Sequence, residues 1–212
     1  MKSIFKFIIE PIEGRYTNEV SVGDKKLIIN SSIEDHRFVN RLGKVICTPM
    51  VNNTNIEVGD HVIVHHNVFR RFYDVKGREK NSSSFFKENM YLCLDDQIFL
   101  YKKDGGDWNT TDNFCFVKPI VKKAKSSLID KEKEQPLTGI LKYNNSVLEE
   151  LGFNRGDLVG FTPDSEYEFL IDGVRMYRVT TNSIIIKYEY KGDETEYYKS
   201  WEKSNRRTDQ SS

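Results

Sequence analysis

The sequence has few of the residues that would point to a cross-linked or metal-bound fold. It contains three cysteines, Cys47, Cys93 and Cys115, an odd number with no Cys-x-x-Cys pair among them. We therefore expect neither a disulfide framework nor a cysteine zinc site, and the reducing cytoplasm is the compartment that we predict. Cys47 and Cys93 lie in apolar stretches, which predicts core residues rather than nucleophiles.

An excess of charge of either sign is also absent. The 32 Lys and Arg residues balance 32 Asp and Glu residues, so the composition argues against nucleic acid or an anionic membrane as the main partner. A net charge near zero gives little repulsion between copies of the chain, and we expect a homo-oligomer.

No apolar run approaches the roughly 18 to 20 residues that span a bilayer, so no membrane association is expected. Residues 1–10 are largely apolar, but Lys6 and Glu10 interrupt them and no small-residue cleavage site follows. This pattern favours a strand over a signal peptide.

Motifs for catalysis or metal binding are lacking as well. There is no Ser-His-Asp order, no phosphate-binding glycine loop and no His-Glu-x-x-His motif, so we predict neither an enzyme nor a cofactor. His61, His65 and His66 form the one histidine cluster. On a strand, His61 and His65 would lie roughly 13 Å apart, too far to share an ion without a bend, and no metal is predicted.

What the sequence does contain is an internal repeat. Residues 90–100 and 176–186 align without gaps at an offset of 86, and each predicts a strand, a polar turn and a second apolar strand, the pattern of a hairpin. Residues 58–64 match 155–161 at an offset of 97. Both of these blocks hold a Gly-Asp pair, in which the glycine can take a positive φ and the aspartate can bind backbone amides before a strand.

Two further blocks extend the repeat in the same order. Residues 43–46 match 139–142 at an offset of 96, with a one-residue slip in the apolar phase, and 7–12 match 115–120 at an offset of 108. The unequal offsets indicate strands that persist while loops differ in length. Helical periodicity is scarce; residues 146–151 are at most one helical turn, with Ser146 as the expected N-cap. Many short strands between polar turns predict an all-β fold of small barrels or sandwiches.

The repeat sets the expected domain boundaries. We predict a first β domain over residues 1–103, a glycine-containing polar linker over 104–112, a second β domain over 113–190 and a charged tail over 191–212. The first domain carries an insertion at residues 67–88 that the second lacks.

The order of these blocks resembles that of the co-chaperonin GroES, or chaperonin-10, family. In that family a first strand precedes a long flexible loop, a G-x-V strand, a V-G-D-x-V-x-F strand and a closing hairpin. The matching stretches are residues 43–46 and 58–64 in the first copy, and 116–118, 138–141, 155–161 and 176–188 in the second. The resemblance covers most of residues 4–102 and 113–190 and implies two tandem GroES-like small β-barrels. Where the family often carries a roof hairpin, the connection at 48–57 is short and the one at 143–154 is occupied by the expected helical turn, so a closed dome is not expected.

The resemblance also implies a function and a site. It implies a co-chaperonin without catalytic residues, which caps a GroEL-like chaperonin ring through apolar mobile loops and so assists protein folding. In the family an apolar tripeptide of the loop docks on the ring. Here the first loop spans about 13–42, and its candidates are Leu27, Ile28 and Ile29. The second spans about 121–137, and its only apolar pair is Leu128 and Ile129. By pattern alone, the run at 27–29 is more typical of a further strand of the barrel, and only the resemblance makes docking equally expected. For Leu128 and Ile129, which lie among Lys, Ser and Glu residues, a role in docking is not favoured.

Two other functions stay open. One is a structural or assembly protein, for example of a virus, built on duplicated β-barrels. The other is a nucleic-acid-binding module formed by the insertion, because basic and aromatic side chains together bind single strands by phosphate contact and base stacking. The neutral overall charge favours solvated side chains on an exposed hairpin instead. The residues concerned are Arg70, Arg71, Lys76, Arg78, Lys80, Phe69, Phe72 and Tyr73.

Overall fold

A computed structural model describes the chain in several stretches, and it is mostly β. The described residues are 1–16, 19–22, 25–28, 39–51, 54–121, 134–190 and 192. The chain divides into two compact units, Met1–Thr111 and Asp112–Ser212. Each unit contains one large antiparallel sheet, and helix is almost absent from the described residues.

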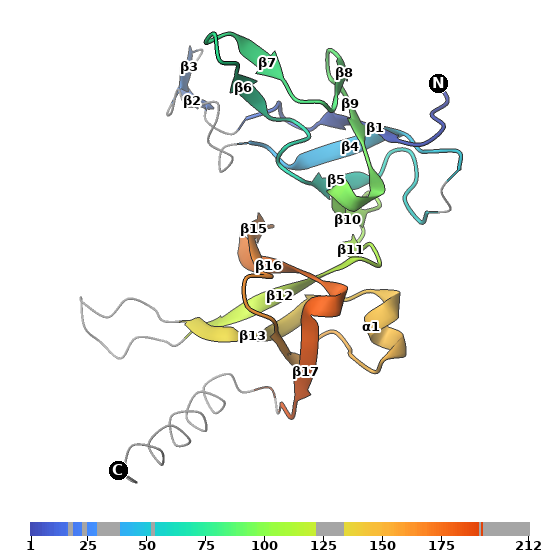
Figure 1. The fold of residues 1–212 in the computed structure, drawn as a ribbon, viewed down its shortest axis with the longest axis vertical. Coiled ribbons are helices and arrows are strands. Elements are labelled where there is room, and N and C mark those ends of the chain that lie inside the picture. Colours follow the sequence, from blue (N-terminus) through green and yellow to red (C-terminus); the bar gives the residue numbers. More distant parts are fainter. Residues whose placement is uncertain are drawn as a thin grey trace, which may run out of the picture. The chain divides into compact units, whose positions relative to one another are not determined.

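The first unit contains a seven-stranded sheet with the strand order β11-β10-β5-β4-β1-β9-β8 (Figure 1). Its strands are β1 (Phe7–Pro11), β4 (Leu42–Cys47), β5 (His61–Val64), β8 (Phe85–Lys87), β9 (Met90–Cys93), β10 (Ile98–Lys102) and β11 (Asn109–Thr110). Two hairpins form separate two-stranded sheets: β2 (Glu19–Val22) with β3 (Lys25–Ile28), and β6 (Arg71–Tyr73) with β7 (Glu79–Asn81).

The second unit contains a six-stranded sheet with the order β15-β16-β12-β13-β14-β17. Its strands are β12 (Phe114–Val121), β13 (Glu134–Tyr143), β14 (Leu158–Phe161), β15 (Tyr167–Ile171), β16 (Val174–Thr180) and β17 (Ile184–Tyr188). One short α-helix, α1 (Ser146–Glu150), joins β13 to β14. No helix in the described part of the chain is long and apolar enough to cross a membrane.

The two sheets share a run of six strands in one order, and the pairings among five of those strands keep the same register. The run β10-β5-β4-β1-β9-β8 corresponds strand by strand to β17-β14-β13-β12-β16-β15. Ile9 pairs with Val45 in the first sheet, and Val117 pairs with Leu141 in the second. These pairs are related by the offsets of 108 and 96 that the sequence repeat gives. Both Val45 and Leu141 are fully buried, so the expected slip in apolar phase is wrong.

The Gly-Asp turns are built alike in both units, as predicted. Gly59 and Gly156 have φ values of 99° and 92°, a conformation that glycine takes without strain. The Asp60 carboxylate accepts from the Glu57 amide at 2.9 Å, and the Asp157 carboxylate accepts from the Asn154 amide at 2.6 Å. Each turn therefore fixes the entry of its chain into β5 or β14.

The predicted hairpins at 90–100 and 176–186 are wrong. β9 pairs with β1 and β8, whereas β10 pairs with β5 and β11. A 3₁₀ turn at Asp95–Gln97 carries the chain from one strand to the other, and a second at Thr181–Ser183 does the same between β16 and β17. β9 and β10, although neighbours in the sequence, are thus separated by three strands of the sheet. The sequence did not predict this, because alternating apolar residues indicate strands but not their partners.

The cores of the two units use equivalent positions. The second core consists of Cys115, Val117, Leu141, Leu148, Val159, Phe161 and Val179. All except Leu148 have a counterpart among the buried residues of the first core, which include Phe7, Ile9, Val45, Val62, Val64 and Cys93. The prediction that Cys47 and Cys93 are buried is confirmed. Burial raises the pKa of the Cys93 thiol, so it is a poor nucleophile.

Two segments between elements differ from their expected roles. Helix α1 is capped by Asn145, whose side chain accepts from the Leu148 amide at 3.0 Å, and not by Ser146. The stretch 104–112 includes β11 and the buried Trp108. The division between the units falls after Thr111. Apart from Gly192, the expected tail at 191–212 lies outside the described residues.

Candidate functional site

The connection between β1 and β4 leaves the sheet through a closed stem. The Ile12 amide donates to the Leu42 carbonyl at 3.0 Å, and the Asn40 amide donates to the Arg15 carbonyl at 2.9 Å. Tyr16 then forms an isolated antiparallel bridge with Val39. The stem therefore continues the β1–β4 ladder beyond the ends of the two strands.

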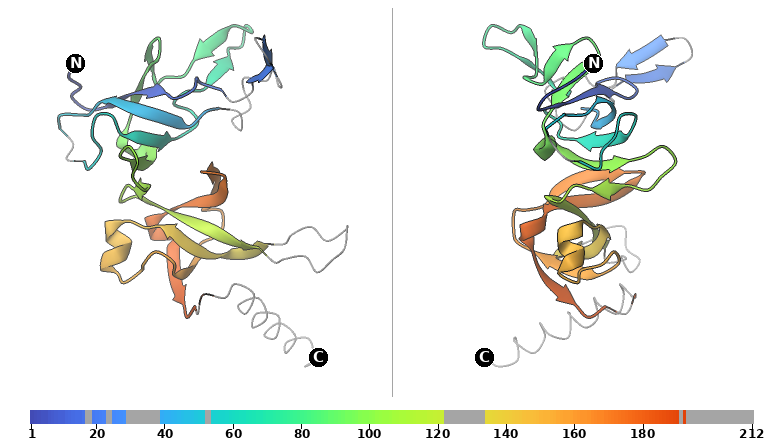
Figure 2. Two further views of the ribbon diagram at one scale, coloured as in Figure 1. Left: turned by 180° about the vertical axis from the view of Figure 1, so that it is seen from behind. Right: turned by 90° about the vertical axis from the view of Figure 1, so that its right-hand side faces the viewer.

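The candidate tripeptide lies beyond this stem. Leu27 and Ile28 belong to β3, which pairs with β2 from Glu19 opposite Ile28 to Val22 opposite Lys25. Among the described strands, β3 pairs with β2 alone, and Figure 2 shows this hairpin apart from the seven-stranded sheet. Leu27 and Ile28 are thus in a strand, but not in a strand of the main sheet. Ile29 lies outside the described residues.

The second candidate pair, Leu128 and Ile129, also lies outside the described residues. The described stem of that connection ends with Val121 paired to Glu134. The Glu134 carboxylate accepts from the Tyr177 hydroxyl at 2.6 Å and forms an ion pair with Arg175.

Arg175 and Tyr177 complete a polar cluster on the return side of this connection. Arg175 also pairs with Glu168 at 3.0 Å and donates to the Tyr177 hydroxyl at 2.9 Å. Partial burial, followed by the hydrogen bond to Glu134, raises the pKa of Tyr177 to about 12. The phenol is therefore neutral near pH 7 and acts as a hydrogen-bond donor to the carboxylate.

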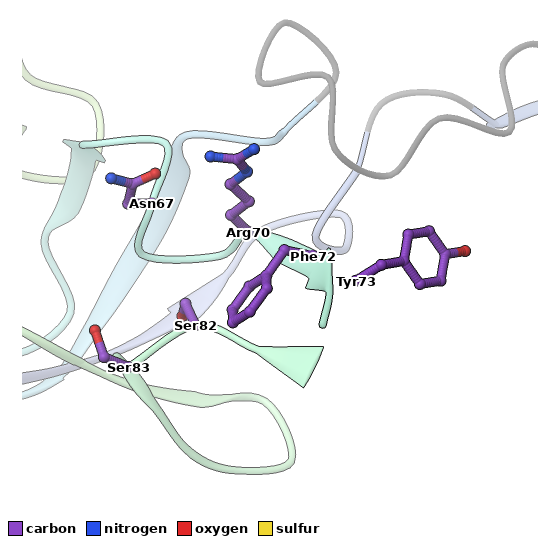
Figure 3. A pocket seen from close by; sticks show the side chains of 6 residues that line it. All are labelled: Asn67, Arg70, Phe72, Tyr73, Ser82 and Ser83. Carbon is purple, nitrogen blue, oxygen red and sulfur yellow. The ribbon is translucent and has the colours of Figure 1, made fainter. Parts of the chain in front are cut away.

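The insertion does not assemble its basic and aromatic residues into one binding surface. Phe69 is fully buried in the core, which excludes it from base stacking. Arg71 pairs with Glu79 at 2.9 Å. A hollow of about 430 Å³ is lined by Asn67, Arg70, Phe72, Tyr73, Ser82 and Ser83. Figure 3 shows the side chains of Arg70, Phe72 and Tyr73 extending in different directions, so they do not converge on one ligand.

The histidines form no metal site in the described residues. His61 begins β5, and His65 follows its end, so the two do not share a strand. The rings of His65 and His66 stack with their centroids 4.2 Å apart. Within the described ranges, no group of three or more His, Cys, Asp or Glu side chains is arranged to hold an ion.

Sequence patterns did not predict the polar residues that surround the two stems. Arg15 and Tyr16 lie at the start of the first connection, and Glu134 lies at the end of the second. The one available signal was the alignment at an offset of 86, which pairs Tyr91 with Tyr177; both rings lie beneath an arginine.

No protein-family model matches this sequence, and no curated protein matches it either.

Proposed function

We propose that the chain is a co-chaperonin of the reducing cytoplasm, which caps a GroEL-type ring through the β1–β4 connection and assists protein folding without catalytic residues of its own. The observation that carries the proposal is the β2–β3 hairpin. It places Leu27 and Ile28 in a strand outside the main sheet, within the connection that joins the first two strands of that sheet. This is where the resemblance to GroES expects the docking segment.

The strand order supports a partly closed barrel in each unit. β9 and β10 are four strand spacings apart, about 19 Å in a flat sheet. The chain between Cys93 and Ile98 spans at most about 17 Å even when fully extended, and a 3₁₀ turn shortens it further. In the second unit the link from Thr180 to Ile184 is one residue shorter. A curl that brings β9 toward β10, and β16 toward β17, accounts for both short links and supports the proposed barrels.

An apolar docking segment of this kind binds weakly and reversibly. Burial of each large aliphatic side chain contributes about 1.5–3 kcal/mol, and ordering a flexible segment offsets several kcal/mol of that gain. A ring that presents several such segments gains avidity without a stronger single contact. Each chain would contribute Leu27, Ile28 and Ile29 from its first connection, and Leu128 and Ile129 from its second.

Contacts between copies would follow from the exposed edge of the second sheet. Ile185 and Ile186 on the edge strand β17 are 63% and 42% exposed. Their equivalents on β10, Phe99 and Leu100, are buried, and β10 pairs with β11. An edge with apolar side chains that no other described strand covers favours strand addition by another chain, so we propose that the protein forms a homo-oligomer. The same edge supports the second candidate, a structural or assembly protein.

The test is nucleotide-dependent co-sedimentation with a GroEL-type chaperonin ring. Wild type should sediment with the ring, and Leu27→Ser or Ile28→Ser should weaken this binding at least tenfold, because each loses the burial of a large aliphatic side chain. Leu170→Ser is the matched control, since Leu170 is 74% exposed on β15 and belongs to neither connection.

Equal loss of binding with Leu170→Ser would contradict docking through β3. Absence of any nucleotide-dependent binding by wild type would exclude the co-chaperonin function. Self-assembly without ring binding would then favour the assembly protein. Salt-sensitive binding of a single-stranded oligonucleotide that Arg70→Ala abolishes would favour the nucleic-acid module.

A further inference from the structure

Arg15, in the stem that follows β1, is bound to the insertion by three hydrogen bonds. The Arg15 guanidinium donates from Nε to the Phe69 carbonyl at 3.0 Å and from Nη2 to the Arg70 carbonyl at 3.3 Å. Its Nη1 donates to Oδ1 of Asn81 at 2.8 Å. One planar side chain therefore holds both ends of the β6–β7 hairpin, a task that suits the fixed donor fork of arginine.

Tyr16 makes a second attachment to the same hairpin. Its hydroxyl accepts from the Arg71 amide at 2.6 Å, at the first residue of β6. The Arg71 guanidinium lies over the Tyr16 ring at 4.9 Å and pairs with Glu79 of β7 at 2.9 Å. Tyr16 is also the stem residue that bridges to Val39, so the contact reaches both arms of the β1–β4 connection.

The attachment rests on the buried core. Arg15 lies over the ring of Tyr91 at 5.2 Å, and Tyr91 is 1% exposed. The Tyr91 ring in turn meets Phe69 edge-on at 5.0 Å and Phe85 at 5.7 Å. The floor beneath Arg15 is thus a packed aromatic cluster, two of whose members come from the insertion. The hairpin is therefore anchored to the core at its base, where it contacts Arg15 and Tyr16 of the stem.

The second unit has no such hairpin. Its β14 and β15 are joined by residues 162–166 alone. The ring equivalent to Tyr91 is Tyr177, and the arginine above it at 5.4 Å is Arg175 of the neighbouring turn. That cluster holds Glu134, at the return end of the second connection. Only the first connection is therefore attached to an inserted element within the described residues.

We propose that the β6–β7 hairpin is a brace that sets the direction in which the β1–β4 connection leaves the first unit, with Arg15 and Tyr16 as its positioning residues. This inference rests on the proposed function for its purpose. A connection that is already oriented loses less conformational freedom when a partner binds, so the brace raises affinity without touching the partner. It also makes the first copy the stronger of the two docking elements.

Hydrogen exchange in the full-length chain tests the brace itself. In Arg15→Ala and in Tyr16→Phe, the amide of Arg71 and those of β2 and β3 should exchange about tenfold faster, the loss expected from one to two hydrogen bonds. Arg15→Lys keeps the positive charge but not the planar guanidinium, so its amide exchange rates should lie between those of wild type and Arg15→Ala. Arg155→Ala is the matched control, because Arg155 is exposed and lies over Tyr143 in the second unit. Exchange in β12 and β13 should stay unchanged in all variants.

Faster exchange at Arg71 with wild-type exchange in β2 and β3 would overturn the proposal, since the hairpin would then be attached without positioning the connection. In the chaperonin assay, Arg15→Ala should bind about tenfold more weakly, mainly through faster dissociation, while Arg155→Ala binds like wild type. If wild type binds no ring, the proposed function fails, and the exchange result still decides whether the brace exists.

Discussion

At the scale of single residues, Asn145 joins three segments of the second unit. Its amide nitrogen donates to the carbonyl oxygens of Asp112 at 3.2 Å and Phe114 at 2.7 Å, and to the Thr181 hydroxyl at 2.7 Å. Its carbonyl oxygen accepts from the Leu148 amide at 3.0 Å. The two N–H groups of this buried amide are shared among three acceptors, and its oxygen caps the helix, so Asn145 links the start of the unit, α1 and the 3₁₀ turn before β17.

Asn145→Ala should lower the free energy of unfolding of the second unit by about 2–4 kcal/mol, because it removes the helix cap and the hydrogen bond to the carbonyl of the buried Phe114. Asn145→Asp keeps the cap acceptor but turns a carboxylate toward two carbonyl oxygens, so it should be no more stable than the alanine variant. Calorimetry measures both. Ser146→Ala, which removes only a bond to the Asp112 carboxylate, should cost under about 1 kcal/mol; a larger loss there would contradict the central role of Asn145.

Gly139 and Gly43 occupy equivalent positions with different surroundings. A Cβ at Gly139 would lie 2.5 Å from both the Lys118 carbonyl oxygen and Val117 Cγ1. At Gly43 the nearest atoms are 3.1 Å away, and one of them belongs to the Phe69 ring. We predict that Gly139→Ala destabilises its unit by about 3 kcal/mol and Gly43→Ala by about 1 kcal/mol. Thermal unfolding of the two variants side by side decides this, and equal losses would contradict it.

Tyr177 gives the second unit a pH dependence at high pH. Its pKa rises from an ordinary value of about 10 to about 12 in the folded chain. The unfolded phenol therefore releases its proton first, so the stabilisation is complete below pH 10 and is lost as the pH rises toward 12. The melting temperature of Tyr177→Phe should fall less between pH 10 and 12 than that of wild type. Parallel curves for the two proteins would show that Tyr177 does not contribute.

At the scale of elements, the sequence repeat predicted more than the strands. Its offsets match the pairing of β1 with β4 and of β12 with β13 residue for residue, because copies of one fold keep their registers. The repeat did not give the partners of the strands on either side of residues 94–97, whose sequence is typical of a hairpin although the two strands do not pair. Alternation of apolar residues reports which face of a strand is buried, and the partner strand is chosen by contacts far away in the chain.

The candidate site was predictable only in part. The position of Leu27 and Ile28 between the first two strands of the sheet followed from the resemblance. The resemblance predicted neither the β2–β3 hairpin that contains these residues nor the proposed β6–β7 brace. Arg15 reaches acceptors 54 to 66 residues away in the sequence, and no local pattern marks such contacts. The neighbouring Arg70 and Arg71 suggest that Phe69 is a surface aromatic, yet it is a core residue.

The exposed edge strand β17 carries a prediction at this scale. If copies associate along β17, Ile185→Lys should shift the mass measured by light scattering toward the 24.8 kDa of a single chain, because a charge on an edge opposes strand addition. Leu170→Lys on β15, at the opposite end of the sheet, is the control. An unchanged oligomer with Ile185→Lys would exclude this edge as the contact.

At the scale of the whole molecule, the boundary between the units can be tested by dissection. Asp112 is tied to the second unit through its carbonyl oxygen, which accepts from Thr181 at 2.7 Å, and through its carboxylate, which accepts from Ser146. A fragment that starts at Asp112 should unfold cooperatively, and one that starts at Phe114 should melt several degrees lower. Denaturation followed by circular dichroism compares them. Equal melting would place the boundary later in the chain.

The identical registers of the two sheets have a consequence for how the chain reaches its fold. During refolding, β1, β4, β5, β9 and β10 each meet a second place with the same strand order and register on the same molecule. Because β9 and β10 do not pair with each other, each must find its partners independently, and β10 can enter the place of β17. Misassembly between adjacent similar units is a known failure of repeat proteins. The copies differ at this pairing, because Gly160 lies opposite Ile186 in the second unit and Ile63 lies opposite Leu100 in the first. An exchanged strand would therefore not pack as the native one does.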